Sequence, residues 1–355
     1  MTGIYIHVPF CLRKCSYCDF YSVKFSEESA EAYTSAVIRN LRRYAPSADS
    51  VYFGGGTPTL LSPAQIGRIL NEIELSDNAE ISMECNPKTA DREKFAEYKS
   101  AGINRVSVGV QSLIDSELSA VGRLHDRAEA VHCIEDISAA GIYNISADIM
   151  LGLPFQTAET LTETINGLLR LPICHISAYM LTVEEGTPLS ADNSLLENIP
   201  DGDGLADLYL LTCDILKKAG FKRYEISNFA KRGAECRHNL KYWQCDDYIG
   251  IGPAAHSCYK GKRFAVPRDI ISFIENDIQQ EIITDDEPLT EEERIMLALR
   301  LSEGISPQDY SCGEQLISRA EPLIKAGFLK KTDGRIALTD KGALVSNDII
   351  VRLIE

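Results

Sequence analysis

The sequence predicts an α/β protein: a parallel β-sheet with helices packed on it, followed by a smaller unit at the C-terminal end. Two observations predict this class. In the first half, short β-rich segments alternate with helical segments, which is typical of a parallel sheet with right-handed crossovers. In residues 286–355, helices come first and a hairpin follows. The β-rich segments lie at 4–8, 50–53, 80–84, 105–110, 145–150 and 175–180.

The helices between these segments have readable ends. The helix predicted over 26–45 begins with acidic residues and ends with arginines, an order that suits the helix dipole. The helix predicted over 62–73 has Ser62 as its N-cap and Pro63 in its first turn. A further helix is expected near 204–219.

Composition divides the chain into three segments. Residues 1–180 carry the alternation, whereas 181–285 is less regular and holds a dense run of aromatic, His and Cys residues. The acidic, turn-rich TDDEPLTEEER then marks a boundary. In 286–355 the order of helices and hairpin resembles a winged helix. This segment has 13 Asp and Glu against 9 Lys and Arg, which argues against DNA binding.

The bulk properties exclude several classes of protein. The net charge of −16 argues against nucleic acid as a partner, because phosphate binding needs a basic surface. We find no run of about 18 apolar residues and no apolar stretch of a secretion signal, so a cytoplasmic location is expected. The 11 cysteines, odd in number and spread along the chain, do not suggest a disulfide framework.

Three cysteines follow the spacing C-x3-C-x2-C on a predicted loop after the first strand: Cys11, Cys15 and Cys18. Thiolates bind zinc and iron–sulfur clusters. Structural zinc takes four ligands, often as C-x2-C pairs, and a four-iron cluster usually has four cysteines. Three cysteines leave one coordination position open. A zinc site completed by His7 is the alternative.

Polar residues also follow the other predicted strands. FGGGTPTLLS (53–62) comes after the second strand, and its glycines allow the backbone to approach a ligand closely. Glu84, Gln111 and Asp148 lie at or just past later strand ends, with Arg123 a little further on. Since these ends share one rim of a parallel sheet, the sequence predicts a site there. A carboxylate such as Glu84 or Asp148 suits a ribose, and Arg123 suits a ligand carboxylate.

The cysteine spacing after a first strand resembles that of the radical S-adenosylmethionine (SAM) enzymes. The resemblance implies a [4Fe-4S] cluster whose open iron binds the amino and carboxylate groups of SAM. It also implies that an electron from the cluster cleaves SAM to an adenosyl radical, while the protein orients the reactants. The Gly-Gly-Thr-Pro stretch would then pair with the SAM amino group.

Several further motifs together resemble the oxygen-independent coproporphyrinogen III oxidase family: YIHVPFC, CSYCDF, FGGGTPT, VSVGVQS, GRLHD, DIMLGLP, and YEISNFA through DDYIGIGPAAHS. The resemblance spans nearly the whole chain. It implies an incomplete TIM-type barrel of six βα units with smaller C-terminal elements. It also implies that the cluster ligands are Cys11, Cys15 and Cys18, and that SAM contacts Tyr5, Tyr17, Gly55, Gly56, Thr57, Glu84, Gln111, Arg123 and Asp148.

Within this family the sequence resembles the haem chaperone branch. The oxidase branch has a fourth cysteine where this chain has Phe20, and an N-terminal extension before the cluster motif. The chaperone branch has a His-Asn-x-x-Tyr-Trp motif, present here as His238, Asn239, Tyr242 and Trp243. The expected function is therefore binding of haem and its insertion into cytochromes or other haem proteins. Decarboxylation of coproporphyrinogen III remains the alternative.

The motif makes His238 the expected haem contact. A neutral imidazole is a common axial ligand, and the neighbouring aromatic rings suit a macrocycle. Cys236 and His256 are rival ligands. The resemblance further implies recipient haem proteins as partners, and leaves open a reductant, a haem donor protein and contact with a membrane.

Overall fold

The computed structural model describes residues 1–44 and 46–355 and confirms the predicted α/β class. One 12-stranded sheet has the order β14-β13-β12-β11-β1-β4-β5-β6-β7-β8-β10-β9. Its central members pair in parallel, as the alternation predicts. These strands are β1 (Thr2–Val8), β4 (Ser47–Gly55), β5 (Glu74–Cys85), β6 (Arg105–Gln111), β7 (Asn144–Leu151) and β8 (His175–Met180).

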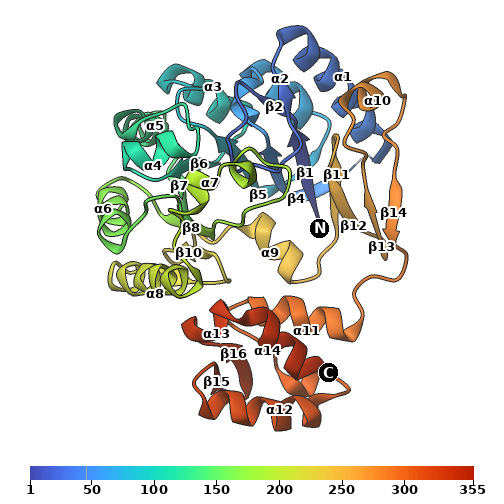
Figure 1. Cartoon of the computed structure of the whole chain (residues 1–355). Helices are drawn as coiled ribbons and strands as arrows, with labels where there is room; N and C mark the ends of the chain where they lie inside the picture. Colours follow the sequence, from blue (N-terminus) through green and yellow to red (C-terminus); the bar gives the residue numbers. More distant parts are fainter. Residues whose placement is uncertain (45) are drawn as a thin grey trace.

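Helices cover the outer face of this curved sheet (Figure 1). Ser62 caps α2 through a capping box, and Pro63 occupies the first turn, as predicted. That helix ends at Leu70, earlier than expected. Ala45, the last residue of the first predicted helix, lies outside the described residues. The helices are α1 (Glu27–Tyr44), α2 (Pro63–Leu70), α3 (Arg92–Ala101), α4 (Asp115–Ala120), α5 (Arg127–Ala139), α6 (Ala158–Leu168) and α8 (Gly202–Lys218).

The two faces of the sheet have different chemistry. In β1, Ile4, Ile6 and Val8 join the main apolar core with residues of α1. The alternate residues Tyr5 and His7 point to the inner face, where they bond to each other. Because side chains alternate along a strand, the outer face is apolar and the inner face carries polar groups.

The middle segment is more ordered than its sequence suggests. Its short strands extend the sheet on both sides, and β11 pairs in parallel with β1. These strands have two to four residues, too few for a clear alternation. They are β9 (Lys222–Arg223), β10 (Asn228–Ala230), β11 (Tyr248–Ile251), β12 (His256–Tyr259), β13 (Lys262–Ala265) and β14 (Ile282–Asp285), with the helices α7 (Asn193–Leu196), α9 (Arg237–Trp243) and α10 (Ile270–Glu275).

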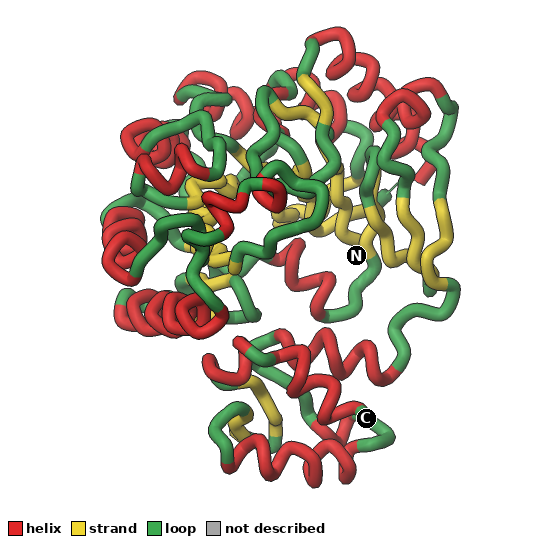
Figure 2. Tube along the Cα trace, in the orientation of Figure 1, coloured by secondary structure: helices red, strands yellow, loops and turns green. Residues whose placement is uncertain are grey.

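The C-terminal unit has its own buried cluster, which includes Leu299, Leu316 and Leu353. Figure 2 shows it as a mainly helical body beside α9, with one hairpin. The hairpin turns at Asp333 and Gly334, both with positive φ, as a tight two-residue turn requires. Its winged-helix character and the three-segment division remain predictions. The elements are α11 (Glu291–Arg300), α12 (Gly313–Lys325), β15 (Leu329–Thr332), β16 (Arg335–Leu338), α13 (Asp340–Leu344) and α14 (Ser346–Ile354).

Among the described residues, no helix combines the length and the apolar character that crossing a membrane would require.

Candidate cluster and cofactor site

A cavity of about 370 Å³ lies at the carboxyl ends of the parallel strands. It brings together residues from seven separate segments of the chain, as the strand-end argument predicts. The predicted site residues that line it are Cys11, Cys15, Tyr17, Cys18, Gly55, Gly56, Glu84, Gln111, Arg123 and Asp148. Tyr5 and Thr57 do not line the cavity but contact residues that do: Tyr5 stacks on Tyr52, and Thr57 bonds to Cys11.

The cysteine loop leaves the sheet after β1 and is closed by two short strands, β2 (Phe10–Cys11) and β3 (Val23–Lys24). Its three thiols are partly exposed. Thr57 Oγ1 donates to Cys11 Sγ at 3.7 Å, and Arg123 Nη1 donates to Cys15 Sγ at 3.4 Å. Two of the three sulfurs therefore each have a hydrogen-bond donor of the protein beside them.

His7 does not complete a zinc site with these thiols. Its ring is buried, with Nδ1 3.1 Å from the Tyr5 hydroxyl and Nε2 2.9 Å from the carbonyl oxygen of Tyr21. Across the described residues, no three His, Cys, Asp or Glu side chains are arranged to hold a single ion. A three-thiol loop with room beside it fits a four-iron cluster with one iron left for another ligand.

The glycine turn after β4 fastens the cysteine loop to the sheet. The Gly56 N–H donates to the Val8 carbonyl at 2.8 Å, and the Thr57 N–H donates to the Phe10 carbonyl at 2.7 Å. A Cβ at position 56 would collide with that same Phe10 carbonyl, and Gly55 has a φ of +103°. These glycines are therefore required by the backbone packing under the cluster loop.

Arg123 is one of three cationic residues that line the cavity, with Arg13 and Lys14. Besides Cys15, it donates to Asn86 Oδ1 at 2.7 Å and to the carbonyl oxygen of Gly109. Its Nε is buried and has no partner among the described residues. A half-buried guanidinium beside Cys15 fits a ligand carboxylate next to the cluster.

Glu84 and Asp148 supply two carboxylates to the same cavity. Glu84 accepts from the Tyr52 hydroxyl at 3.1 Å and from the Gly55 N–H at 3.0 Å. Asp148 accepts from the Ser107 hydroxyl at 2.9 Å. Burial, together with the charge of Asp148, raises the pKa of Glu84 to about 7, and burial also raises the pKa of Asp148. Such a pair fits the hydroxyl groups and positive charge of a nucleoside-like cation.

The raised pKa of Glu84 predicts how stability depends on pH. Between about pH 4.5 and pH 7, the folded protein keeps a proton that the unfolded chain releases, so Glu84 lowers stability as the pH rises. We therefore compare the free energy of unfolding of Glu84→Gln with that of the unaltered chain, both without cofactor. The difference in favour of the variant should grow with pH in this window, by up to about 1.4 kcal/mol for each pH unit. Urea unfolding at several pH values measures this gain. The exposed Glu184→Gln variant is the control, and a parallel pH profile for both variants would contradict the expectation.

Several cavity residues were not expected from the sequence: Tyr52, Asn86, Ser107, Met150 and Tyr179. Asn86 is the most informative, because its amide joins Arg123 to Thr57. It stands two residues past Glu84, at the end of β5. In the sequence, only its position directly after a strand could have indicated that it belongs to the site.

His238 lies elsewhere, on α9, which closes the opposite end of the sheet. Its ring is fully buried. Nδ1 is 3.0 Å from Ser50 Oγ, and Nε2 is 2.8 Å from the Tyr242 hydroxyl. Burial, reinforced by Lys241, lowers the pKa of His238 to about 3. In this conformation the ring has no free nitrogen for an iron atom, so the expected haem contact would need α9 to move.

The two rival ligands differ in exposure. Cys236 is buried, its thiol donates to Glu80 at 3.5 Å, and burial raises its pKa to about 12. His256, at the start of β12, is exposed.

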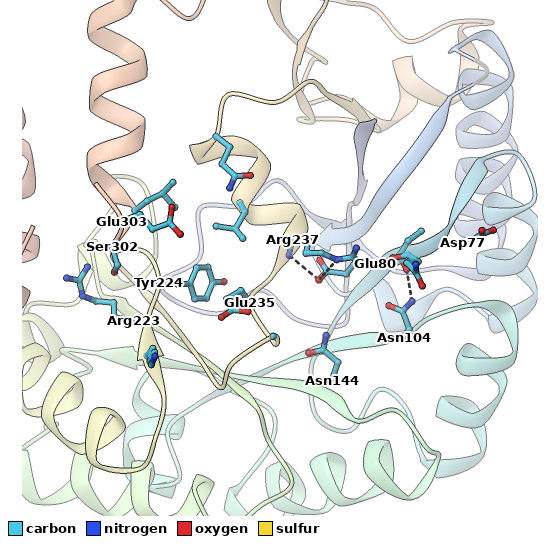
Figure 3. A pocket seen from close by; sticks show the side chains of 17 residues that line it. Asp77, Glu80, Asn104, Asn144, Arg223, Tyr224, Glu235, Arg237, Ser302 and Glu303 are labelled. Carbon is cyan, nitrogen blue, oxygen red and sulfur yellow. Dashed lines mark hydrogen bonds and ion pairs between the residues drawn. The ribbon is translucent and has the colours of Figure 1, made fainter. Parts of the chain in front are cut away.

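A second cavity, of about 920 Å³, lies between α9 and the C-terminal unit. Figure 3 shows Glu80, Arg237 and Tyr224 among the side chains around it. Glu80 holds the start of α9, accepting from the N–H of His238 at 3.0 Å and of Arg237 at 3.1 Å. The lining mixes both signs of charge, and it contains no imidazole or thiol.

Comparison with known proteins identifies the family. A family model described as the radical SAM superfamily matches residues 5–168, and one described as the HemN C-terminal domain matches residues 291–345. The chain is 31% identical to the heme chaperone HemW of Escherichia coli, over 98% of this chain and 97% of that protein. It is 32% identical to HemW of Bacillus subtilis, over 98% of each.

Two further comparisons complete the picture. The mitochondrial radical S-adenosyl methionine domain-containing protein 1 of Bos taurus is 38% identical to this chain over 270 residues. The aligned part covers 72% of this chain and 60% of that protein. The solved structure of the coproporphyrinogen III oxidase HemN from Escherichia coli has a TM-score of 0.84 and 20% identity, covering 99% of this chain and 90% of that one. That likeness shows the fold. The chain therefore belongs to the radical SAM superfamily and, within its HemN-like family, to the branch of the heme chaperone HemW.

Proposed function

We propose that this chain binds a [4Fe-4S] cluster, SAM and haem, and that it delivers haem to a recipient haem protein. One observation carries the proposal: a three-thiol loop shares its cavity with Arg123, Glu84 and Asp148, in a chain that matches heme chaperones along nearly its whole length. When bound, the cluster supplies an iron with an open position and a source of one electron.

The chain's own residues would position SAM. The guanidinium of Arg123, which already donates to Cys15, would pair with the SAM carboxylate. Glu84 and Asp148 would accept hydrogen bonds from the ribose hydroxyls, with Tyr52 and Ser107 holding the two carboxylates in place. Gln111 and Tyr17 complete the walls.

Phe20 supports the chaperone function over the oxidase function. It stands where the oxidase branch has a fourth cysteine, and its side chain lines the cavity and is 62% exposed. An exposed phenyl ring offers apolar contact but no ligand for a metal. The partners proposed are haem, recipient haem proteins, and a reductant or haem donor. The net charge of −16 would favour basic partner surfaces.

An anaerobic assay separates the two functions. The cluster is reconstituted, and SAM, a strong reductant and coproporphyrinogen III are added beside a known oxidase. We expect no decarboxylated tetrapyrrole from this chain, together with transfer of bound haem to an apo-cytochrome. Decarboxylation at the rate of the known oxidase would overturn the chaperone proposal and establish the alternative.

A further inference from the structure

The histidines of this chain fall into two groups by exposure. His7, His125, His175 and His238 are buried, and each ring makes at least one hydrogen bond. Only His132 and His256 are exposed. His132 lies on α5, 3.5 Å from Asp136. A haem iron can be reached by an imidazole only where the ring has solvent access and a free nitrogen, which leaves these two residues in the present conformation.

His256 lies at the end of the sheet nearest the cysteine loop. It begins β12, which pairs with β11 through Cys258 and Tyr248, and β11 pairs in turn with β1. Alternation along β12 puts His256 on the same face as Cys258. The absence of a side chain at Gly250 lets the backbone of His256 pass close to β11.

The chain after β13 joins His256 to the cysteine loop. The Val266 N–H donates to the carbonyl of Ala255 at 2.8 Å, so residues 266–268 run beside the start of β12. Arg268 then donates to the backbone carbonyl and the carboxylate of Asp19, next to Phe20. In agreement with this proximity, the charges of Arg268 and His256 both help to lower the pKa of His7, after the larger effect of burial.

The outer rim, defined as Phe20, His256 and Arg268, therefore combines three kinds of group. Phe20 has an exposed aromatic face, His256 an exposed imidazole, and Arg268 a guanidinium that stays 56% exposed. A flat apolar molecule with a metal at its centre and carboxylates at its edge needs these three contacts. The second cavity, between α9 and the C-terminal unit, offers neither an imidazole nor a thiol among its lining residues.

We propose that His256 is the axial ligand of haem, which lies on the outer rim with Phe20 against the macrocycle and Arg268 paired with a propionate. The inference rests on the proposed haem binding and names its site. His238 then has a different part: with Tyr242 and Ser50 it holds α9 in place at the other end of the sheet.

The test is a titration of cluster-loaded protein with ferric haem under anaerobic conditions, followed by haem absorption and by electron paramagnetic resonance. Loading the cluster first keeps the thiolates of the cysteine loop from binding haem. His256→Ala should weaken haem binding at least about tenfold, equal to about 1.4 kcal/mol, and should change the spin state of the iron. His132→Ala, the other exposed histidine, is the matched control and should bind as the unaltered protein does.

The remaining variants separate the outcomes. Phe20→Ser should weaken binding but keep the spectrum of the iron, because it removes contact area and not the ligand. An unchanged titration and spectrum for His256→Ala would overturn the inference. Loss of the ligand signature in a folded His238→Ala variant, with His256→Ala unaffected, would also overturn it and leave the haem chaperone proposal standing. Failure of the unaltered protein to bind haem would refute the proposed function itself.

Discussion

Cys15→Ser is expected to abolish cluster binding. After anaerobic reconstitution, the variant should lack the iron, the sulfide and the visible absorption of the unaltered protein. The physical reason is the ligand count: with three thiolates for four irons, the site has no spare protein ligand. A serine hydroxyl stays protonated near neutral pH and binds iron poorly. Cys11→Ser and Cys18→Ser should behave alike.

The same variant should also lose SAM binding. Arg123 directs one nitrogen to Cys15 Sγ and another to Asn86, so the thiolate helps to fix the guanidinium. Equilibrium dialysis with SAM measures this loss. Cys174→Ser is the control, because its thiol bonds to the Asn144 side chain and lies outside the cavity. Full cluster content in Cys15→Ser would contradict the ligand assignment.

Glu80→Ala should be strongly destabilising, with a loss of about 3–5 kcal/mol in the free energy of unfolding. Glu80 is 3% exposed and accepts from two N–H groups at the start of α9. Its ion-pair partner is Arg237, 3.9 Å away, and its charge also acts on Arg105, which is 1% exposed. Burial disfavours the charge of Arg105, whereas Cys236 and Glu80 raise its pKa. Removing the carboxylate leaves the two N–H donors at the start of α9 unpaired and takes away a negative charge near a buried cation.

Urea unfolding measures the loss, and two companion variants divide it. Glu80→Gln keeps an oxygen for the α9 N–H groups but removes the charge, so it should lose less than the alanine variant. Glu303→Ala changes an exposed carboxylate on the second cavity, which Glu80 also lines. Its free energy of unfolding should stay within about 0.5 kcal/mol of that of the unaltered protein. Equal stability of Glu80→Ala and Glu303→Ala would show that Glu80 does not anchor α9.

The central fold was predictable because its signals are local. The alternation of β-rich and helical segments located every central strand, and Ser62 located the start of α2. The first part of β5 was missed, because Glu74–Asn78 is largely exposed and shows no apolar alternation. The edge strands of the middle segment were missed because two to four residues cannot define a period. Their pairing with β1 and β8 is a tertiary effect.

The site was predictable where a residue's place on a strand determined its direction. Glu84 and Asp148 followed from the rule that strand ends share a rim, and the structure brings them into one cavity. The environment of His238 could not be inferred in this way. Its partner Ser50 lies on β4, far away in the sequence, and nothing local distinguishes a buried imidazole from a ligand. Exposure, which separates His256 from His238, appears only in three dimensions.

The cavity between α9 and the C-terminal unit has a consequence for how this protein can diverge. Its walls carry charges of both signs, and several of its lining side chains are exposed to solvent. Substitutions of such exposed side chains cost little, because solvent rearranges to fit each new side chain. Exposed lining residues such as Lys222, Gln244 and Glu303 can therefore change over generations, while the buried Glu80 and the start of α9 stay fixed and selection on the cluster end of the sheet continues undisturbed.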